Sequence, residues 1–165
     1  MIRQFVPGEY CLKCKGCCRF SEVDSVWLPC LLDEEILELM DKKIPPAYIN
    51  LSRRIKPVAD PQGEGFLCAF LGVKDSKCQI YQHRPFECQL YPFLIALRKK
   101  KVLLTVDLNC PYVKEKMGSP EFKEYIDFLV SYLNSPKQLE ILKNNPQIIQ
   151  AYQEVLDIVE LKFQK

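Results

Sequence analysis

The sequence has very few of the residues on which several common kinds of functional site depend. It contains one histidine, His83, and six glycines in 165 residues. With a single histidine, we expect neither a Ser/His/Asp catalytic set nor a metal site built from histidine and carboxylate ligands. Gly63-x-Gly65 is too short for a glycine-rich nucleotide loop. We therefore expect no catalytic machinery that works independently of a metal, and no catalytic residue can be named.

Long apolar runs and a strong charge of one sign are also missing. No segment approaches the roughly 20 apolar residues that a membrane span requires, and residues 1–10 contain no run suited to a signal peptide. The formal net charge is +2, from 23 basic and 21 acidic residues, so bulk charge does not imply nucleic acid. These features predict a cytoplasmic protein with neither a membrane nor a nucleic-acid partner. The length of 165 residues suggests one domain that can bury a core without help from a metal.

What the sequence does contain is cysteine, nine in all. Four of them fall within eight residues, in the run C-L-K-C-K-G-C-C at positions 11–18. Thiolates two residues apart can turn toward one centre, which is why such pairs recur in zinc and iron–sulfur sites. A disulfide framework is disfavoured, because a reducing compartment keeps thiols free, the count is odd, and adjacent cysteines pair only with strain. The run therefore predicts thiolate coordination of a metal.

The later cysteines differ in their surroundings. Cys78 is expected at the start of a strand, and Cys88 one turn inside a short helix that begins at Pro85. Cys110 follows a predicted strand and precedes a proline, which fixes the corner at which a ligand can be held. Cys30 lies in an apolar stretch before a helix expected at 33–43, whose inward face includes Leu37 and Met40. Free cysteine is among the most buried residue types, so Cys30 is predicted to fill the core.

The last third of the chain lacks cysteine and is predicted to be helical. It combines an N-cap residue with proline at three places, Ser119-Pro120, Ser135-Pro136 and Asn145-Pro146, so three helix starts are expected. Apolar residues at helical spacing, including those at 148–159, form core stripes or a docking face for a protein partner. Residues 93–97 and 102–108 predict an antiparallel hairpin.

Together these elements predict an α+β fold. A small cysteine-rich metal-binding core with a short hairpin, at 1–112, is followed by a helical extension at 113–165, and the two form a single domain.

The arrangement of the cysteines and their neighbours resembles the CxxCxxCC cysteine-cluster family, also called YkgJ-type and described as candidate zinc- or iron-chelating proteins. The resemblance covers roughly residues 8–112 and leaves Cys30 without a matching position. The family is also similar to part of the flagellin lysine methylases, which are associated with an iron–sulfur cluster. That similarity implies iron–sulfur chemistry without implying methyl transfer. The motifs that carry the resemblance are Cys11-x-x-Cys14-x-x-Cys17-Cys18, Cys68-x-Phe70-Leu71, Cys78-x-Ile80-Tyr81-x-x-Arg84-Pro85-x-x-Cys88-x-x-Tyr91-Pro92 and Cys110-Pro111.

The resemblance implies a set of eight metal-ligating cysteines, Cys11, Cys14, Cys17, Cys18, Cys68, Cys78, Cys88 and Cys110. One tetrahedral zinc or one cubane cluster needs only four, so two sites, one polynuclear site or a separate role for some thiols stay open. The compact run resembles ferredoxin ligation, which favours a 4Fe-4S cluster over a four-cysteine zinc site. For a cubane, the predicted first ligand set is Cys11, Cys14, Cys18 and Cys88. The other four would form a second site or surround the first.

Three other residues are candidates for binding the cofactor. Arg84 can donate to sulfur and partly neutralise a cluster with four thiolates, although a salt bridge or a cap explains it equally well. Tyr81 and Tyr91 would wall the site and offer hydroxyl groups, unless they only pack. The leading function is metal-cluster binding for metal or cluster handling or electron transfer. The alternatives are an iron–sulfur-dependent, methylase-like enzyme that modifies a protein or small molecule, and a protein that binds zinc through four cysteines.

Overall fold

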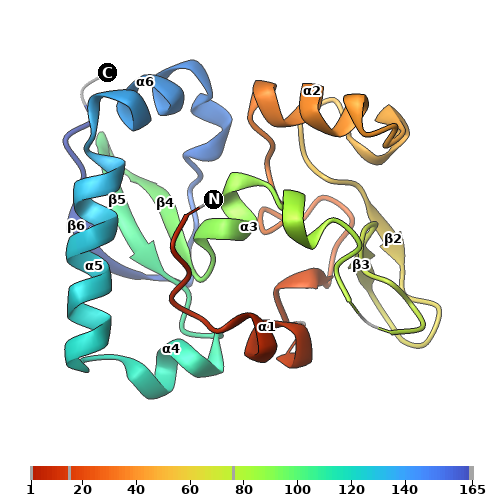
Figure 1. Cartoon of the computed structure of the whole chain (residues 1–165), viewed down its shortest axis with the longest axis horizontal. Helices are drawn as coiled ribbons and strands as arrows, with labels where there is room; N and C mark the ends of the chain where they lie inside the picture. Colours follow the sequence, from red (N-terminus) through yellow and green to blue (C-terminus); the bar gives the residue numbers. More distant parts are fainter. Residues whose placement is uncertain (1, 15, 76, 164–165) are drawn as a thin grey trace. The chain divides into compact units, whose positions relative to one another are not determined.

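The computed structural model describes residues 2–14, 16–75 and 77–163 (Figure 1). The chain divides into two compact units. The first unit comprises Ile2 and Pro7–Gln89, and the second comprises Arg3–Val6 and the chain from Leu90 on. Both contain helices and antiparallel strands, so the predicted α+β class is confirmed. The predicted single domain with a subdivision at residue 112 stays a prediction, and the two units divide at a different place, after Gln89.

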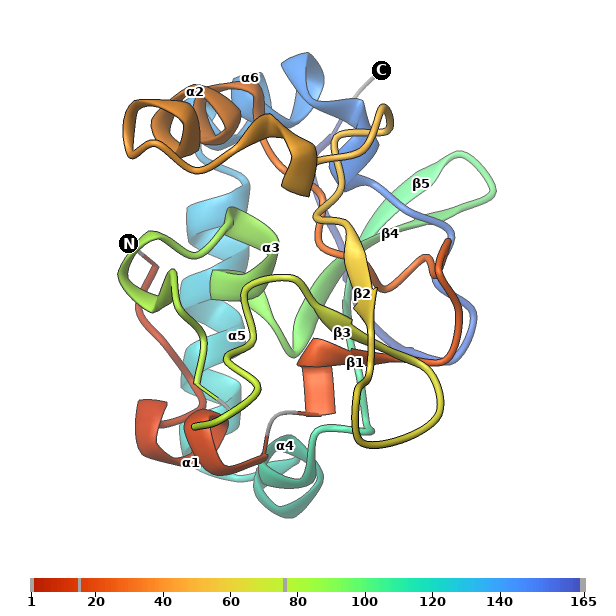
Figure 2. The same ribbon diagram turned by 90° about the vertical axis from the view of Figure 1, so that its right-hand side faces the viewer.

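The first unit is built from short elements. Its strands are only two or three residues long and form an antiparallel sheet in the order β1-β3-β2, which Figure 2 shows side by side. These strands are β1 (Arg19–Phe20), β2 (Pro57–Ala59) and β3 (Phe66–Cys68). The helices are α1 (Gly8–Cys14), α2 (Asp33–Asp41) and α3 (Phe86–Leu90), with 3-10 turns η1 (Gly16–Cys18), η2 (Pro46–Tyr48) and η3 (Tyr81–His83).

The apolar core of the first unit incorporates cysteine. Leu28, Leu31, Leu39 and other buried residues pack together with Cys68, and Cys18 and Cys78 pack against this cluster. The helix predicted at 33–43 forms as α2, but the expectation for its inward face was partly wrong. Leu37 and Met40 are 63% and 48% exposed, whereas Leu39 is buried. A nine-residue helix buries one narrow stripe, here Ile36 and Leu39 three residues apart, and the residue following each turns outward.

The second unit contains longer, more regular elements. Its sheet has the order β4-β5-β6, from β4 (Phe93–Arg98), β5 (Lys101–Val106) and β6 (Leu156–Glu160), and every pairing is antiparallel. The predicted hairpin is therefore confirmed as β4 and β5. The helices are α4 (Pro111–Lys116), α5 (Pro120–Leu133) and α6 (Pro136–Asn144), followed by the 3-10 turn η4 (Pro146–Ile148).

Two of the three predicted helix starts are confirmed. Ser119 and Ser135 each accept a hydrogen bond from the backbone N–H three residues on, and they cap α5 and α6. The third helix was wrong, because Pro146 begins only one 3-10 turn and the following chain pairs with β5 as β6. A capping motif indicates only where a helix can begin, and it carries no information on whether the following chain pairs with a distant strand. Ion pairs from Arg98 to Asp157 (3.2 Å) and from Lys101 to Glu160 (2.6 Å) help to hold the strand there. The protein partner predicted for the C-terminal helices stays a prediction.

Aromatic rings form the centre of the second unit. Phe93 of β4 is fully buried and lies 5.9 Å from Phe122 and 5.2 Å from Tyr125, centroid to centroid, so α5 packs on the sheet. Phe5, from the segment Arg3–Val6, contacts the same three rings. Within the described residues, no helix combines the length and apolar character needed to cross a membrane.

Candidate metal centre

The first four cysteines lie on two successive helical pieces. Cys11 and Cys14 are three residues apart on α1 and so share a face, and Cys17 and Cys18 belong to η1. Gly16 lies beside the thiol of Cys14, since a Cβ at this glycine would stand 3.6 Å from that sulfur. Cys14 and Cys17 are exposed, whereas Cys11 and Cys18 are partly buried. The run therefore presents thiols both to solvent and toward the interior.

Cys68 and Cys78 receive hydrogen bonds from the backbone that follows them. The N–H groups of Phe70 and Leu71 bond to the sulfur of Cys68, and the N–H of Ile80 bonds to that of Cys78. Burial still dominates, raising the pKa of Cys68 to about 11 and raising that of Cys78 as well. Because N–H donors stabilise a thiolate, both turns favour the form of cysteine that binds metal. None of these three hydrogen bonds could be read from the sequence, since each depends on the exact turn.

The strand expected at Cys78 is not present. Cys78 makes only an isolated bridge with Leu71, and the chain then enters η3. Hydrogen bonds from Gly72 N–H to Lys77 O and from Gln79 N–H to Phe70 O flank this bridge, and η3 begins only three residues after Cys78. The expectation for Cys88 is confirmed, because it lies inside α3, which begins after Pro85.

Five thiols of the first unit interact electrostatically. A hydrogen bond between the two thiols of Cys17 and Cys18 is the largest cause of the strongly raised Cys18 pKa, followed by burial and by the charges of the neighbouring cysteines Cys17, Cys68 and Cys88. Burial raises the pKa of Cys88 well above its ordinary value, and the charges of Cys68, Cys17 and Cys78 raise it further. Buried thiolates this close repel one another, so they need protons or a cation to coexist.

This grouping does not follow the predicted division of the eight cysteines into two sets of four. Cys18 and Cys88 interact with Cys17, Cys68 and Cys78, three thiols that the sequence assigned to the other set. The ligand set itself stays a prediction. Among the described residues, no three Cys, His, Asp or Glu side chains lie in an arrangement ready to hold a metal ion.

Arg84 and Tyr81 contact each other, and Arg84 lies close enough to Cys78 for its charge to act on that thiol, but their role in binding a cofactor stays a prediction. The guanidinium carbon of Arg84 is 3.8 Å from the centroid of the Tyr81 ring, and Arg84 is 9% exposed. Its positive charge lowers the pKa of Cys78, against the larger effect of burial. The Tyr81 hydroxyl lies against Gly8, where a Cβ would come within 2.7 Å of it. Arg84 thus offers charge to a thiolate, and Tyr81 holds its guanidinium in place.

Tyr91 and Cys110 belong to the second unit. The Tyr91 hydroxyl donates to Asp107 (2.9 Å), whose other carboxylate oxygen accepts from the N–H of Asn109 (2.8 Å). These bonds shape the turn before Cys110, which is buried and occupies the N-cap position of α4, directly before Pro111. The roles of Tyr91 in cofactor binding and of Cys110 as a ligand stay predictions.

Cys30 is the core residue that the sequence predicted. It is fully buried, and burial raises the pKa of its thiol to about 12. Its backbone N–H donates to the carboxylate of Glu87 at 2.6 Å.

The chain shares more than a cysteine pattern with known proteins. A family model matches residues 10–116, which include Cys11 through Cys110, and describes a candidate zinc- or iron-chelating domain. The chain belongs to the CxxCxxCC family. It is similar to the uncharacterized protein MJ0661 of Methanocaldococcus jannaschii, with 27% identity over 130 residues, which cover 75% of this chain and 69% of that protein. No solved structure matches. Membership confirms the predicted family and supports metal binding in general.

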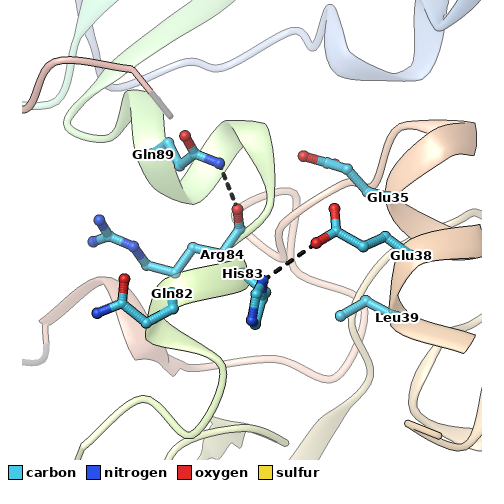
Figure 3. A pocket seen from close by; sticks show the side chains of 7 residues that line it. All are labelled: Glu35, Glu38, Leu39, Gln82, His83, Arg84 and Gln89. Carbon is cyan, nitrogen blue, oxygen red and sulfur yellow. Dashed lines mark hydrogen bonds and ion pairs between the residues drawn. The ribbon is translucent and has the colours of Figure 1, made fainter. Parts of the chain in front are cut away.

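A pocket in this CxxCxxCC protein lies between α2 and the chain around His83 and Arg84 (Figure 3). Its volume is about 230 Å³, and none of its lining residues is a cysteine. His83 Nδ1 pairs with Glu38 at 3.2 Å, and Gln89 Nε2 donates to the Arg84 carbonyl at 2.7 Å. The imidazole of the lone histidine is therefore engaged with a carboxylate. The residues that line the pocket are Glu35, Glu38, Leu39, Gln82, His83, Arg84 and Gln89.

Sequence reasoning missed two carboxylates near this site, Glu35 and Glu87. Glu35 is the third residue of α2 and accepts from the N–H of Leu32, as the glutamate of a capping box does. The signal was hidden because leucine, not serine or threonine, holds the N-cap position. No sequence signal distinguishes Glu87.

Proposed function

We propose that this CxxCxxCC protein binds an iron–sulfur cluster, 4Fe-4S being favoured, through cysteine thiolates. We further propose that it acts in metal or cluster handling or in electron transfer. The observation that carries the proposal is the gathering of cysteines in the first unit, where Cys18 and Cys78 pack against the core cluster that contains Cys68. Backbone N–H groups bond to the sulfurs of Cys68 and Cys78, and the charge of Arg84 acts on Cys78. Such interactions around sulfur are the means by which proteins hold and tune thiolate-bound metals.

The donor set fits a thiophilic metal. The five interacting thiols are soft ligands, which select iron–sulfur clusters, zinc or Cu(I) over hard cations. Five thiols exceed the four that either one tetrahedral zinc or one cubane cluster needs, so their number does not choose between the two. The compact C-x-x-C-x-x-C run resembles ferredoxin ligation and favours a cluster, although the family description includes zinc as well as iron. When bound, a cluster supplies one-electron redox chemistry or a store of iron and sulfide. The chain's own residues supply the sulfurs, a compensating charge from Arg84, and an apolar wall.

Partial exposure of the cysteines favours handling or electron transfer over a sealed structural site. Cys14 and Cys17 are exposed, while Cys68 is buried within the core. A cluster held between them would be reachable from one side by a partner or a chelator. The methylase-like alternative would gain support from a pocket that meets the thiols, and the pocket in Figure 3 has none in its lining. Free thiols suit a reducing, cytoplasmic setting, which is part of the proposal.

Anaerobic purification followed by measurement of iron, inorganic sulfide and zinc tests the proposal. We expect iron and sulfide in similar amounts and broad absorption near ~400 nm. Zinc alone, without sulfide or this absorption, would replace the cluster by a zinc site of four cysteines. Protein that retains no metal and takes none up would remove the proposal altogether.

Serine substitutions test the ligands. Cys11→Ser, Cys14→Ser, Cys18→Ser and Cys88→Ser should each remove most of the bound iron. The matched control is Cys30→Ser, which should leave the metal content unchanged. Full metal content in Cys88→Ser protein would show that the ligand assignment is incorrect.

A further inference from the structure

Two carboxylates, the partly buried Glu35 and the buried Glu87, join the segment 30–35 to the helix that carries Cys88. Glu35 of α2 accepts hydrogen bonds from Leu32 N–H (2.9 Å) and from Phe86 N–H, the first residue of α3 (2.5 Å). In the opposite direction, Glu87 of α3 accepts from Cys30 N–H at 2.6 Å. Figure 3 shows Glu35 extending from α2 toward the segment of Arg84 and Gln89. We call this reciprocal pair, Glu35 to Phe86 and Glu87 to Cys30, the carboxylate clasp.

Helix α3 depends on such contacts because it is very short. A five-residue helix is far below the length at which helices persist alone, and its first N–H groups have no partners inside the helix. Glu35 supplies an acceptor for one of these groups, at Phe86. Glu87 then fixes the next residue of the helix to the fully buried Cys30. The position of α3, and with it that of Cys88, is therefore set from outside the helix.

Electrostatics alone would disfavour a glutamate at position 87. Its negative charge lies close to Cys88 and would repel a thiolate there. Burial of the Glu87 side chain, with the residue 8% exposed, adds a desolvation cost. The hydrogen bond from Cys30 N–H offsets these costs. Glu87 therefore contributes by fixing the position of α3, not by its charge.

We propose that Glu35 and Glu87 are positioning residues for the metal centre, which hold α3 so that Cys88 can bind metal. The inference rests on the proposed function, because it assigns Cys88 as a ligand. Removing either carboxylate frees α3 from the segment 30–35 and weakens metal binding through Cys88. Loss of partners that orient metal ligands typically lowers metal affinity by about 10- to 100-fold.

The test measures Co²⁺ affinity of the full-length apo protein by anaerobic competition with a chelator. Glu87→Met and Glu35→Met keep the bulk of the side chain without a strong acceptor, and each should weaken Co²⁺ binding by about 10- to 100-fold. Glu87→Gln and Glu35→Gln retain an acceptor oxygen and should stay within a few-fold of wild type. Glu34→Met, at an exposed position of the same helix, is the matched control and should change nothing.

A double-mutant cycle with Cys88→Ser distinguishes positioning from general destabilisation. If Glu87 acts through Cys88, the Glu87→Met effect should largely vanish in the Cys88→Ser background. The positioning role would be wrong if Glu87→Met weakened Co²⁺ binding equally in the Cys88→Ser background. It would also be wrong if the Gln variants lost as much Co²⁺ affinity as the Met variants. Should a Met variant fail to fold, the Gln result still decides whether an acceptor suffices. Wild-type protein that holds no iron with sulfide after anaerobic purification and also binds no Co²⁺ would instead contradict the proposed function, which separates the two failures.

Discussion

The two units of the molecule differ in how their structure is maintained. The first unit has strands of two or three residues and no helix longer than nine among its described residues, yet it holds eight of the nine cysteines. The second has strands of five or six residues and a helix of fourteen, packed on buried aromatic rings. Regular hydrogen bonding and apolar packing account for the second unit. The first has less of both.

This difference changes the expected role of the metal. From chain length alone, a domain of 165 residues can bury a sufficient core without metal. The division after Gln89 assigns nearly all the cysteines to a smaller unit, in which Cys68 is itself part of the core. Small units often need a metal or another crosslink to be stable. The metal should therefore stabilise the first unit and leave the second almost unaffected.

Metal removal should produce the largest difference in stability between the two units. Treatment with a chelator should cost the first unit several kcal/mol, since structural metal sites contribute on the order of 10 kcal/mol to folding at neutral pH. Hydrogen exchange of backbone amides, followed by mass spectrometry, should show protection lost in β1–β3 and α1–α3. Protection in β4, β5 and α5 should persist. Equal losses in both units would mean that they fold as one cooperative body.

The next largest effect should come from a cavity, and it should appear in the second unit rather than in the first. Phe93→Ala removes a fully buried ring that contacts Phe5, Phe122 and Tyr125, and such truncations cost about 3–5 kcal/mol. Chemical denaturation should detect this loss, while the metal content per folded molecule should remain that of wild type. Lys123→Ala, at an exposed position of α5, serves as the control. Loss of metal in Phe93→Ala protein would contradict the independence of the units.

The sequence predicted the parts of both units that are decided locally. Proline after a capping serine identified α5 and α6, and the cysteine motifs identified the family. It failed where distant segments decide the structure. The chain at 156–160 forms β6 because it pairs with the edge of β5. Glu87 accepts the hydrogen bond of Cys30 N–H only because the fold brings α3 to Cys30. Likewise, the N–H groups that bond to the sulfurs of Cys68 and Cys78 depend on turns that no motif specifies.

A change of pH should affect the first unit through Glu35. Burial raises the pKa of this carboxyl from 4.5 to about 7, with the N–H groups of Leu32 and Phe86 acting in the opposite direction. Between these values the folded protein binds a proton that the unfolded chain has released, so stability rises as pH falls from about 7 to about 4.5. The full shift corresponds to at most about 3 kcal/mol.

The measurement is urea unfolding of the apo protein at about pH 7.5 and about pH 5.5, which bracket the folded-state pKa, compared with Glu35→Gln. Wild type should gain stability at the lower pH relative to this variant, which cannot titrate. Glu34→Gln, on the exposed side of α2, should retain the wild-type response. An identical pH response in Glu35→Gln and wild type would show that Glu35 does not titrate in this range.

Removal of one helix cap should give the smallest effect and the most local one. Ser119 accepts a hydrogen bond from Phe122 N–H at 3.1 Å and precedes Pro120 at the start of α5. Ser119→Ala leaves that N–H without its side-chain acceptor, at a typical cost of about 1 kcal/mol, whereas Ser119→Asp keeps an acceptor and should retain most of the stability. Denaturation and hydrogen exchange should place the loss in α5 alone. Because nothing in the first unit depends on this cap, a change in metal content in Ser119→Ala protein would show that the two units are energetically coupled.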